Sequence, residues 1–93
     1  GLPLLVTENG IATADDSERI AYTSDALASV LAAVRDDVDV RGYFHWSLLD
    51  NFEWAEGFAG SFGLYSFDAG SLARTARPSA ALYGQVARTG IVP

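Results

Sequence analysis

The stretch that decides the fold is Leu4-Leu5-Val6-Thr7-Glu8-Asn9-Gly10. Its apolar part belongs to a run from Leu2 to Thr7, which predicts a strand buried on both faces as in a parallel sheet. Asn9-Gly10 breaks this strand. Glu8 therefore stands at the carboxyl end of a strand, where parallel α/β folds bind ligands and carry out catalysis. A nucleophilic or proton-transferring carboxylate is one interpretation of Glu8, and an acid that caps the turn is the other.

A helix and a second strand follow. Apolar residues on one stripe predict a helix from Glu18 to Arg35, after the candidate N-caps Asp15, Asp16 and Ser17. The stripe consists of Ile20, Leu27, Val30, Leu31 and Val34. Aromatic residues and Val favour a strand over Val40–Leu49. Strand, helix and strand together predict one βαβ unit with parallel strands and a right-handed crossover.

The remainder of the chain predicts less regular structure. Residues 50–61 are expected to form a loop, Phe62–Phe67 a short strand or extended segment, and Asp68–Arg77 an irregular segment. Pro78 suits the first turn of a last helix, which Gly90 would end. Its inner side would consist of Leu82, Tyr83 and Val86. The acidic pairs Asp15-Asp16 and Asp36-Asp37 are expected to be solvated helix ends.

Composition excludes several classes of function. With 93 residues the chain is one domain at most, and its 49% hydrophobic content is that of a core-forming chain. A net charge of −6 without any Lys argues against a nucleic-acid partner. The absence of Cys excludes thiolate metal sites, and no apolar run is long enough to predict a membrane span. A single histidine, His45, cannot form a metal cluster, so we expect a structural histidine, no metal and no cofactor.

Aromatic and acidic residues near the second strand suggest a sugar site. Indole rings stack on the flat C–H faces of sugars, and a carboxylate accepts hydrogen bonds from pairs of hydroxyls. Trp46, Glu53 and Trp54 could supply both kinds of contact. The alternatives are that Trp46 is a core residue of its strand and that Glu53 is a solvated loop acid.

Two segments resemble a known family. Thr7-Glu8-Asn9-Gly10 and the stretch from Gly42 to Trp54, GYFHWSLLDNFEW, are similar to the C-terminal part of family 1 glycoside hydrolases, the β-glucosidases. The resemblance continues through Phe62-Gly63-Leu64 and Arg77-Pro78-Ser79. It implies an α/β fold in which residues 1–93 are the last quarter of one (β/α)8 TIM-barrel domain, with Leu4–Thr7 as strand seven and Val40–Leu49 as strand eight.

The resemblance also implies roles for individual residues. Glu8 matches the catalytic nucleophile, which forms a covalent glycosyl-enzyme. Trp46 matches the indole under the glycone, Glu53 the acid that binds its O4 and O6 hydroxyls, and Trp54 the indole whose N–H reaches O3. Phe62 matches an aromatic residue at the pocket border. A carboxylate at Glu53 would repel a 6-phosphate, so the implied substrate is an unphosphorylated β-glucoside, galactoside or fucoside.

Some features depart from the family pattern. The Ala12–Ser17 loop is short, the segment before Phe62 lacks its usual basic residues, and Asp68–Arg74 is off-pattern. The chain also contains no Asn-Glu-Pro, the motif that carries the family's acid/base glutamate. Since retaining hydrolysis needs two carboxyl groups, we expect the 93 residues alone to be inactive and to need strands one to six of the same protein. A non-catalytic sugar- or partner-binding remnant and one half of a split barrel remain alternatives. The family implies a cytoplasmic location, and the lack of a long apolar run argues against a membrane partner.

Overall fold

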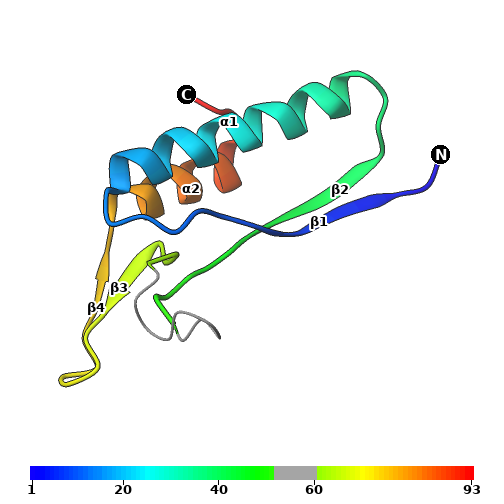
Figure 1. The fold of residues 1–93 in the computed structure, drawn as a ribbon. Coiled ribbons are helices and arrows are strands. Elements are labelled where there is room, and N and C mark those ends of the chain that lie inside the picture. The colour runs from blue at the N-terminus through cyan, green and yellow to red at the C-terminus, as the bar shows by residue number, and fades with distance from the viewer. Residues whose placement is uncertain (52–60) are drawn as a thin grey trace.

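A computed structural model describes residues 1–51 and 61–93. In chain order its elements are β1 (Leu4–Asn9), α1 (Asp16–Arg35), β2 (Val40–His45), β3 (Tyr65–Phe67), β4 (Arg74–Ala76) and α2 (Pro78–Thr89). β1 and β2 form one two-stranded sheet, and β3 and β4 form another (Figure 1). Within the described part of the chain, no helix is long and apolar enough to cross a membrane.

The βαβ unit predicted from the sequence is confirmed. β1 and β2 are parallel neighbours, and α1 connects them. Both helices lie on the same side of this sheet (Figure 1). The predicted end of the second strand at Leu49 is wrong: β2 ends at His45, Trp46 makes the last backbone bond to β1, and the chain then pairs with residues 62–65. Ser47 N–H donates to the Phe62 carbonyl at 3.2 Å, and Leu64 N–H donates to the Ser47 carbonyl at 2.9 Å.

α1 begins two residues before the predicted start, because its N-terminus is capped by Asp15. The Asp15 carboxylate accepts hydrogen bonds from the backbone N–H and the hydroxyl of Ser17, at 2.9 and 2.6 Å. Leu27, from the predicted apolar stripe, is buried. Val34 is 46% exposed, since it lies in the last turn of α1 beside an open groove between α1 and β2.

The segment predicted to be irregular contains a strand. β4 pairs with β3 in antiparallel register, Tyr65 opposite Ala76 and Phe67 opposite Arg74. Asp68 closes the hairpin, since its carboxylate accepts the backbone N–H groups of Gly70 and Ser71. All three residues of β4 are exposed, so this strand has no apolar alternation that would have revealed it.

The last helix has the predicted limits. Pro78 occupies its first turn, and Gly90 ends it with φ 69°, a left-handed conformation that glycine adopts without strain. The predicted inner side is half-buried; it consists of Leu82, Tyr83 and Val86.

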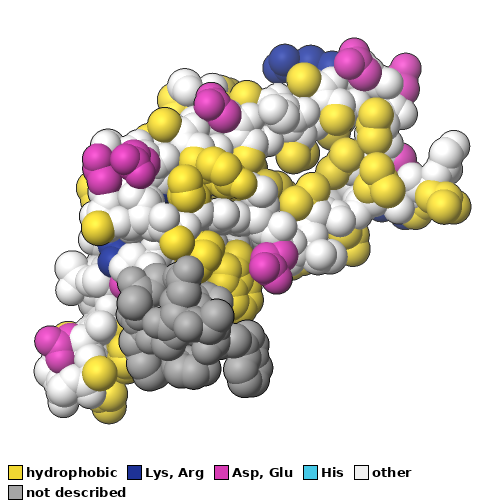
Figure 2. All heavy atoms as spheres, in the orientation of Figure 1, with side chains coloured by type: hydrophobic (Ala, Val, Ile, Leu, Met, Phe, Trp, Pro, Cys, Tyr) yellow, Lys and Arg dark blue, Asp and Glu magenta, His cyan; other side chains and the backbone are white. Residues whose placement is uncertain are grey.

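The core of the described chain is small. Leu27 and Leu64 are the buried hydrophobic residues of the described ranges. The expected burial of the first strand on both faces is wrong, because Leu4 and Leu5 are 50% and 58% exposed. β1 has one neighbouring strand, and both helices lie on one face of the sheet. Figure 2 accordingly shows hydrophobic side chains at the surface along the strands, and acidic side chains over both ends of α1.

Candidate functional site

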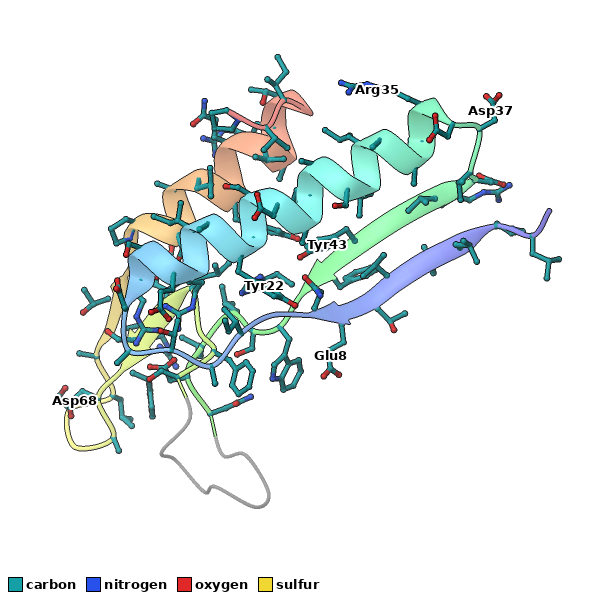
Figure 3. All side chains as sticks on the ribbon, turned by 45° about the horizontal axis from the view of Figure 1, so that its top comes forward. Glu8, Tyr22, Arg35, Asp37, Tyr43 and Asp68 are labelled. Carbon is teal, nitrogen blue, oxygen red and sulfur yellow. The ribbon has the colours of Figure 1, made fainter. Side chains whose placement is uncertain are left out.

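The first component of the site is the end of β1. Glu8 is the last residue but one of this strand, and it is exposed. Its side chain points away from α1, whereas Tyr22 and Tyr43 lie between the helix and the sheet (Figure 3). The Asn9 side chain, in contrast, lies on the helix-facing side, where it donates a hydrogen bond to the hydroxyl of Tyr22 in α1. The carboxylate of Glu8 is therefore open to a ligand on the uncovered face.

Trp46 lies next to this strand end. Asn9 is in register with His45, and the Trp46 N–H donates to the Asn9 carbonyl at 2.8 Å. The following turn passes so close that a Cβ atom on Gly10 would overlap the carbonyl oxygen of Trp46. The Trp46–Ser47 peptide bond is cis. Trp46 comes after the last residue of β2 and is 37% exposed, so it is not a core residue of the strand.

Phe62 is brought to the same end of the sheet through the backbone. Its carbonyl accepts the N–H of Ser47, the residue after Trp46. The structure thus assembles three of the predicted site residues, Glu8, Trp46 and Phe62, around the carboxyl ends of β1 and β2. Glu53 and Trp54 lie outside the described residues.

An ion pair fixes the start of the segment that carries those two residues. The Arg77 guanidinium donates to both carboxylate oxygens of Asp50, at 2.9 and 2.7 Å, and also to the Gly63 carbonyl. Burial by itself would raise the pKa of Asp50. The hydrogen bonds from Arg77 and from Gly63 N–H outweigh burial, so the pKa of Asp50 lies below its usual range.

A fully buried arginine holds the other end of the same segment. Arg19, in α1, donates to the carbonyl oxygens of Thr13 and Ser61 and forms a 2.7 Å ion pair with Asp16. Its exposed fraction is 0%. Because Thr13 belongs to the loop after β1, Arg19 connects the Glu8 strand end with the point where the chain returns at Ser61.

The expectation that Asp16 is a solvated helix end is wrong. Its carboxylate accepts hydrogen bonds from the backbone N–H and the hydroxyl of Ser79, at 2.8 and 2.7 Å, in addition to the bond from Arg19. Burial raises the pKa of Asp16, but the bonds from Ser79 and Arg19 outweigh it and lower the pKa. Asp16 therefore joins the first turns of α1 and α2.

Sequence reasoning missed the two arginines. The spacing of Asp16 and Arg19, three residues apart on a helix, is a signal for a side-chain pair. It does not reveal that a backbone carbonyl 42 residues away also accepts a hydrogen bond from this arginine. The sequence marks Arg77 only as a charged residue directly before the proline that starts a helix, and this does not identify its partner.

His45 lies on the helix side of the site. Its ring contacts the ring of Tyr83, with centroids 5.6 Å apart. Burial lowers the pKa of His45, and the Phe62 backbone, which favours the charged ring, offsets this effect only in part. This position suits the structural role expected from the sequence.

Comparison with known proteins places the chain in a family. The model of glycosyl hydrolase family 1 matches residues 1–91. The chain is 45% identical to a β-galactosidase of Sulfolobus acidocaldarius, over 100% of this chain and 19% of that protein. It superposes on a β-glycosidase from Pyrococcus horikoshii with a TM-score of 0.95 and 47% identity, over 98% of this chain and 22% of that one.

A solved β-glucosidase, 1317 in its apo form, gives a TM-score of 0.92 at 52% identity, over 96% of this chain and 22% of that one. The chain therefore spans about a fifth of the length of these relatives. The parallel βαβ unit matches an α/β part of these larger proteins, and the chain is a member of glycosyl hydrolase family 1.

Proposed function

We propose that the chain is the C-terminal part of a retaining β-glycosidase built as a (β/α)8 barrel. β1 would be barrel strand seven and β2 strand eight. The uncovered face of the β1–β2 sheet supports this proposal, because Leu5 and Phe44, which both approach the outer side of Gly42, are each more than half exposed. A barrel buries such residues by closing the sheet on itself.

Glu8 is the proposed nucleophile. The observation that carries this role is the exposed carboxylate at the carboxyl end of β1, held beside Trp46 by the Asn9–Trp46 backbone bond. The Glu8 carboxylate attacks the anomeric carbon as the bond to the leaving-group oxygen breaks, and a second glutamate protonates that oxygen. Water then releases the sugar from Glu8, with the second glutamate acting as base.

The remaining proposed contacts bind the sugar. Trp46 lies under the glycone, Phe62 borders its pocket, and Glu53 and Trp54 bind its hydroxyls. The relatives include enzymes named β-galactosidase and β-glucosidase, which supports an unphosphorylated β-glucoside, galactoside or fucoside as substrate. The second glutamate belongs to an Asn-Glu-Pro motif that the 93 residues do not contain. The isolated chain is therefore proposed to be inactive.

Trapping with a 2-fluoro β-glycoside tests the nucleophile. The full-length enzyme should become covalently labelled, and peptide mapping should place the label on Glu8. Glu8→Gln should lower kcat by a factor on the order of 10⁴ or more. Glu18→Gln, at an exposed residue of the first turn of α1, is the matched control and should leave kcat unchanged. A label on another residue would refute the assignment.

The isolated chain gives a second test of the proposal. The purified 93 residues should not hydrolyse an aryl β-glycoside. Hydrolysis that disappears in Glu8→Ala would show that this part of the enzyme needs no second glutamate, and the fragment proposal would then be wrong.

A further inference from the structure

The pairing of β1 with β2 is irregular where Glu8 lies. Val6 is opposite Tyr43, and the next registered pair is Asn9 opposite His45. Three residue steps on β1 therefore match two on β2, which is the pattern of a β-bulge. Bulges re-aim side chains, and inside one the regular ladder does not fix the backbone. The orientation of Glu8 must be set by something other than strand pairing.

The neighbouring residue, Asn9, has contacts that can set the orientation of Glu8. Its side-chain Nδ2 donates to the hydroxyl of Tyr22, in α1, at 3.1 Å. The hydroxyl of Tyr43, in β2, donates to its Oδ1 at 2.8 Å. Its backbone carbonyl accepts the Trp46 N–H at 2.8 Å. One residue is thus held by the helix, by the neighbouring strand and by the residue proposed to lie under the sugar.

Tyr43 is itself well supported. The hydroxyl of Tyr83, in α2, donates to the Tyr43 carbonyl at 3.3 Å, and the two rings are 6.3 Å apart. Burial raises the pKa of Tyr43 to about 12, so its hydroxyl stays protonated and able to donate at any pH where an enzyme works. Tyr22 is 37% exposed, and its hydrogen bond with Asn9 is the longer of the two, so it holds Asn9 less firmly than Tyr43 does.

We propose that Asn9 is a positioning residue for Glu8, and that the Tyr22–Asn9–Tyr43 clamp holds the bulge in the conformation that aims the Glu8 carboxylate at the substrate. The clamp lies on the helix side of the sheet and Glu8 on the other side (Figure 3), so the tyrosines act through the backbone and touch no sugar. The inference rests on the proposed role of Glu8 as nucleophile.

The test measures the rate of 2-fluoro glycoside trapping in the full-length enzyme at saturating reagent. Tyr43→Phe removes one hydroxyl, and its rate constant should fall by about 10- to 100-fold, since small misplacements of a reacting group are that costly. Tyr22→Phe should have a smaller effect in the same direction. The concentration of reagent at half-saturation should change less than the rate constant, because the clamp does not bind the sugar.

Tyr65→Phe is the matched control, because the Tyr65 hydroxyl makes no hydrogen bond within residues 1–51 and 61–93. It should trap at the wild-type rate. Thermal unfolding identifies any variant that has lost its fold. In an Asn9→Ala background, Tyr43→Phe should cause no further slowing if the tyrosine acts through Asn9.

Two results would overturn the inference: equal trapping rates for Tyr43→Phe and Tyr65→Phe, or undiminished slowing by Tyr43→Phe in the Asn9→Ala background. If Asn9→Ala does not fold, the comparison of Tyr43→Phe with Tyr65→Phe decides alone. Failure of the proposed function is distinct, because it would appear in the wild-type enzyme as a label on a residue other than Glu8.

Discussion

Arg77 and Asp50 join the start of α2 to the start of the segment 52–60 through two parallel hydrogen bonds, 2.9 and 2.7 Å long. Both side chains are about one-fifth exposed, at 20% and 21%. The same guanidinium donates to the Gly63 carbonyl, where the chain returns from that segment. Hence a single arginine contacts both Asp50, before this segment, and Gly63, after it.

The two parallel hydrogen bonds from Arg77 to Asp50 should contribute more to stability than the charge of Arg77 alone. Arg77→Lys keeps the charge but cannot make two parallel bonds, so we expect a loss of about 1–3 kcal/mol in the free energy of unfolding. The KM for an aryl glycoside should rise, since Asp50 and Gly63, which flank the segment with Glu53 and Trp54, would be held less firmly. Urea unfolding and steady-state kinetics of the full-length enzyme measure the two effects.

Arg41→Lys is the control for this prediction. Arg41 also forks onto a carboxylate, that of Asp39, but its side chain is 64% exposed. Exposed ion pairs contribute roughly 0–1 kcal/mol to stability, so Arg41→Lys should hardly change the free energy of unfolding. Equal losses in the two variants would mean that the Arg77 pair is an ordinary surface contact.

Arg19 should be among the most sensitive residues for stability. It is fully buried and paired with Asp16, and removal of one partner of a buried pair costs about 3–5 kcal/mol. We expect Arg19→Met to lose that much in urea unfolding. Asp16→Asn in the Arg19→Met background should cost less than Asp16→Asn alone, because the aspartate no longer has its charged partner. Strict additivity of the two changes would contradict this coupling.

The predictable part of the fold was the part with periodic apolar sequence. The stripe that includes Leu27 and the run Leu4–Val6 predicted the βαβ unit, and Pro78 and Gly90 marked the limits of α2. β4 could not be predicted, since its three residues are exposed and carry no hydrophobic pattern, and the turn that Asp68 closes brings it beside β3.

Site residues could be predicted from the sequence where a short local pattern places them. They could not be predicted where their position depends on partners far along the chain. Glu8 could be placed at a strand end from the pattern alone, whereas Trp46 was expected inside a strand that runs to Leu49 and instead follows the last residue of β2. The acceptors of Arg19 and the partner of Arg77 come from elements far along the chain, and no local signal identifies them. The bulge at Glu8 was also invisible, because register depends on the neighbouring strand.

His45 should make stability depend on pH. Burial lowers its pKa. As the pH falls below the ordinary value of 6.5, His45 is therefore protonated in the unfolded chain while it stays neutral in the folded chain. The contribution of the neutral ring is complete above pH 6.5 and is lost as the pH falls through the folded pKa. We expect His45→Phe to flatten the dependence of the unfolding free energy on pH between about 7.5 and 5.5. Parallel curves for the wild type and the variant would refute a buried neutral His45.

Gly10 should be required for both stability and activity. A Cβ atom there would overlap the Trp46 carbonyl, and neither backbone can move without disturbing the strand end that carries Glu8. Gly10→Ala is therefore expected to cost about 1–3 kcal/mol in unfolding free energy through overpacking. A displaced Trp46 should also lower kcat/KM by about 10-fold or more.

Gly84→Ala is the matched control for this last prediction. A Cβ on Gly84, in α2, would meet the flexible end of the Arg88 side chain at 3.2 Å and no other residue so closely. Since alanine favours helix over glycine by about 0.5–1 kcal/mol, Gly84→Ala should raise stability and leave kcat/KM unchanged. If Gly10→Ala behaved like Gly84→Ala, the close approach of the β1 turn to Trp46 would not be what holds the two strand ends together.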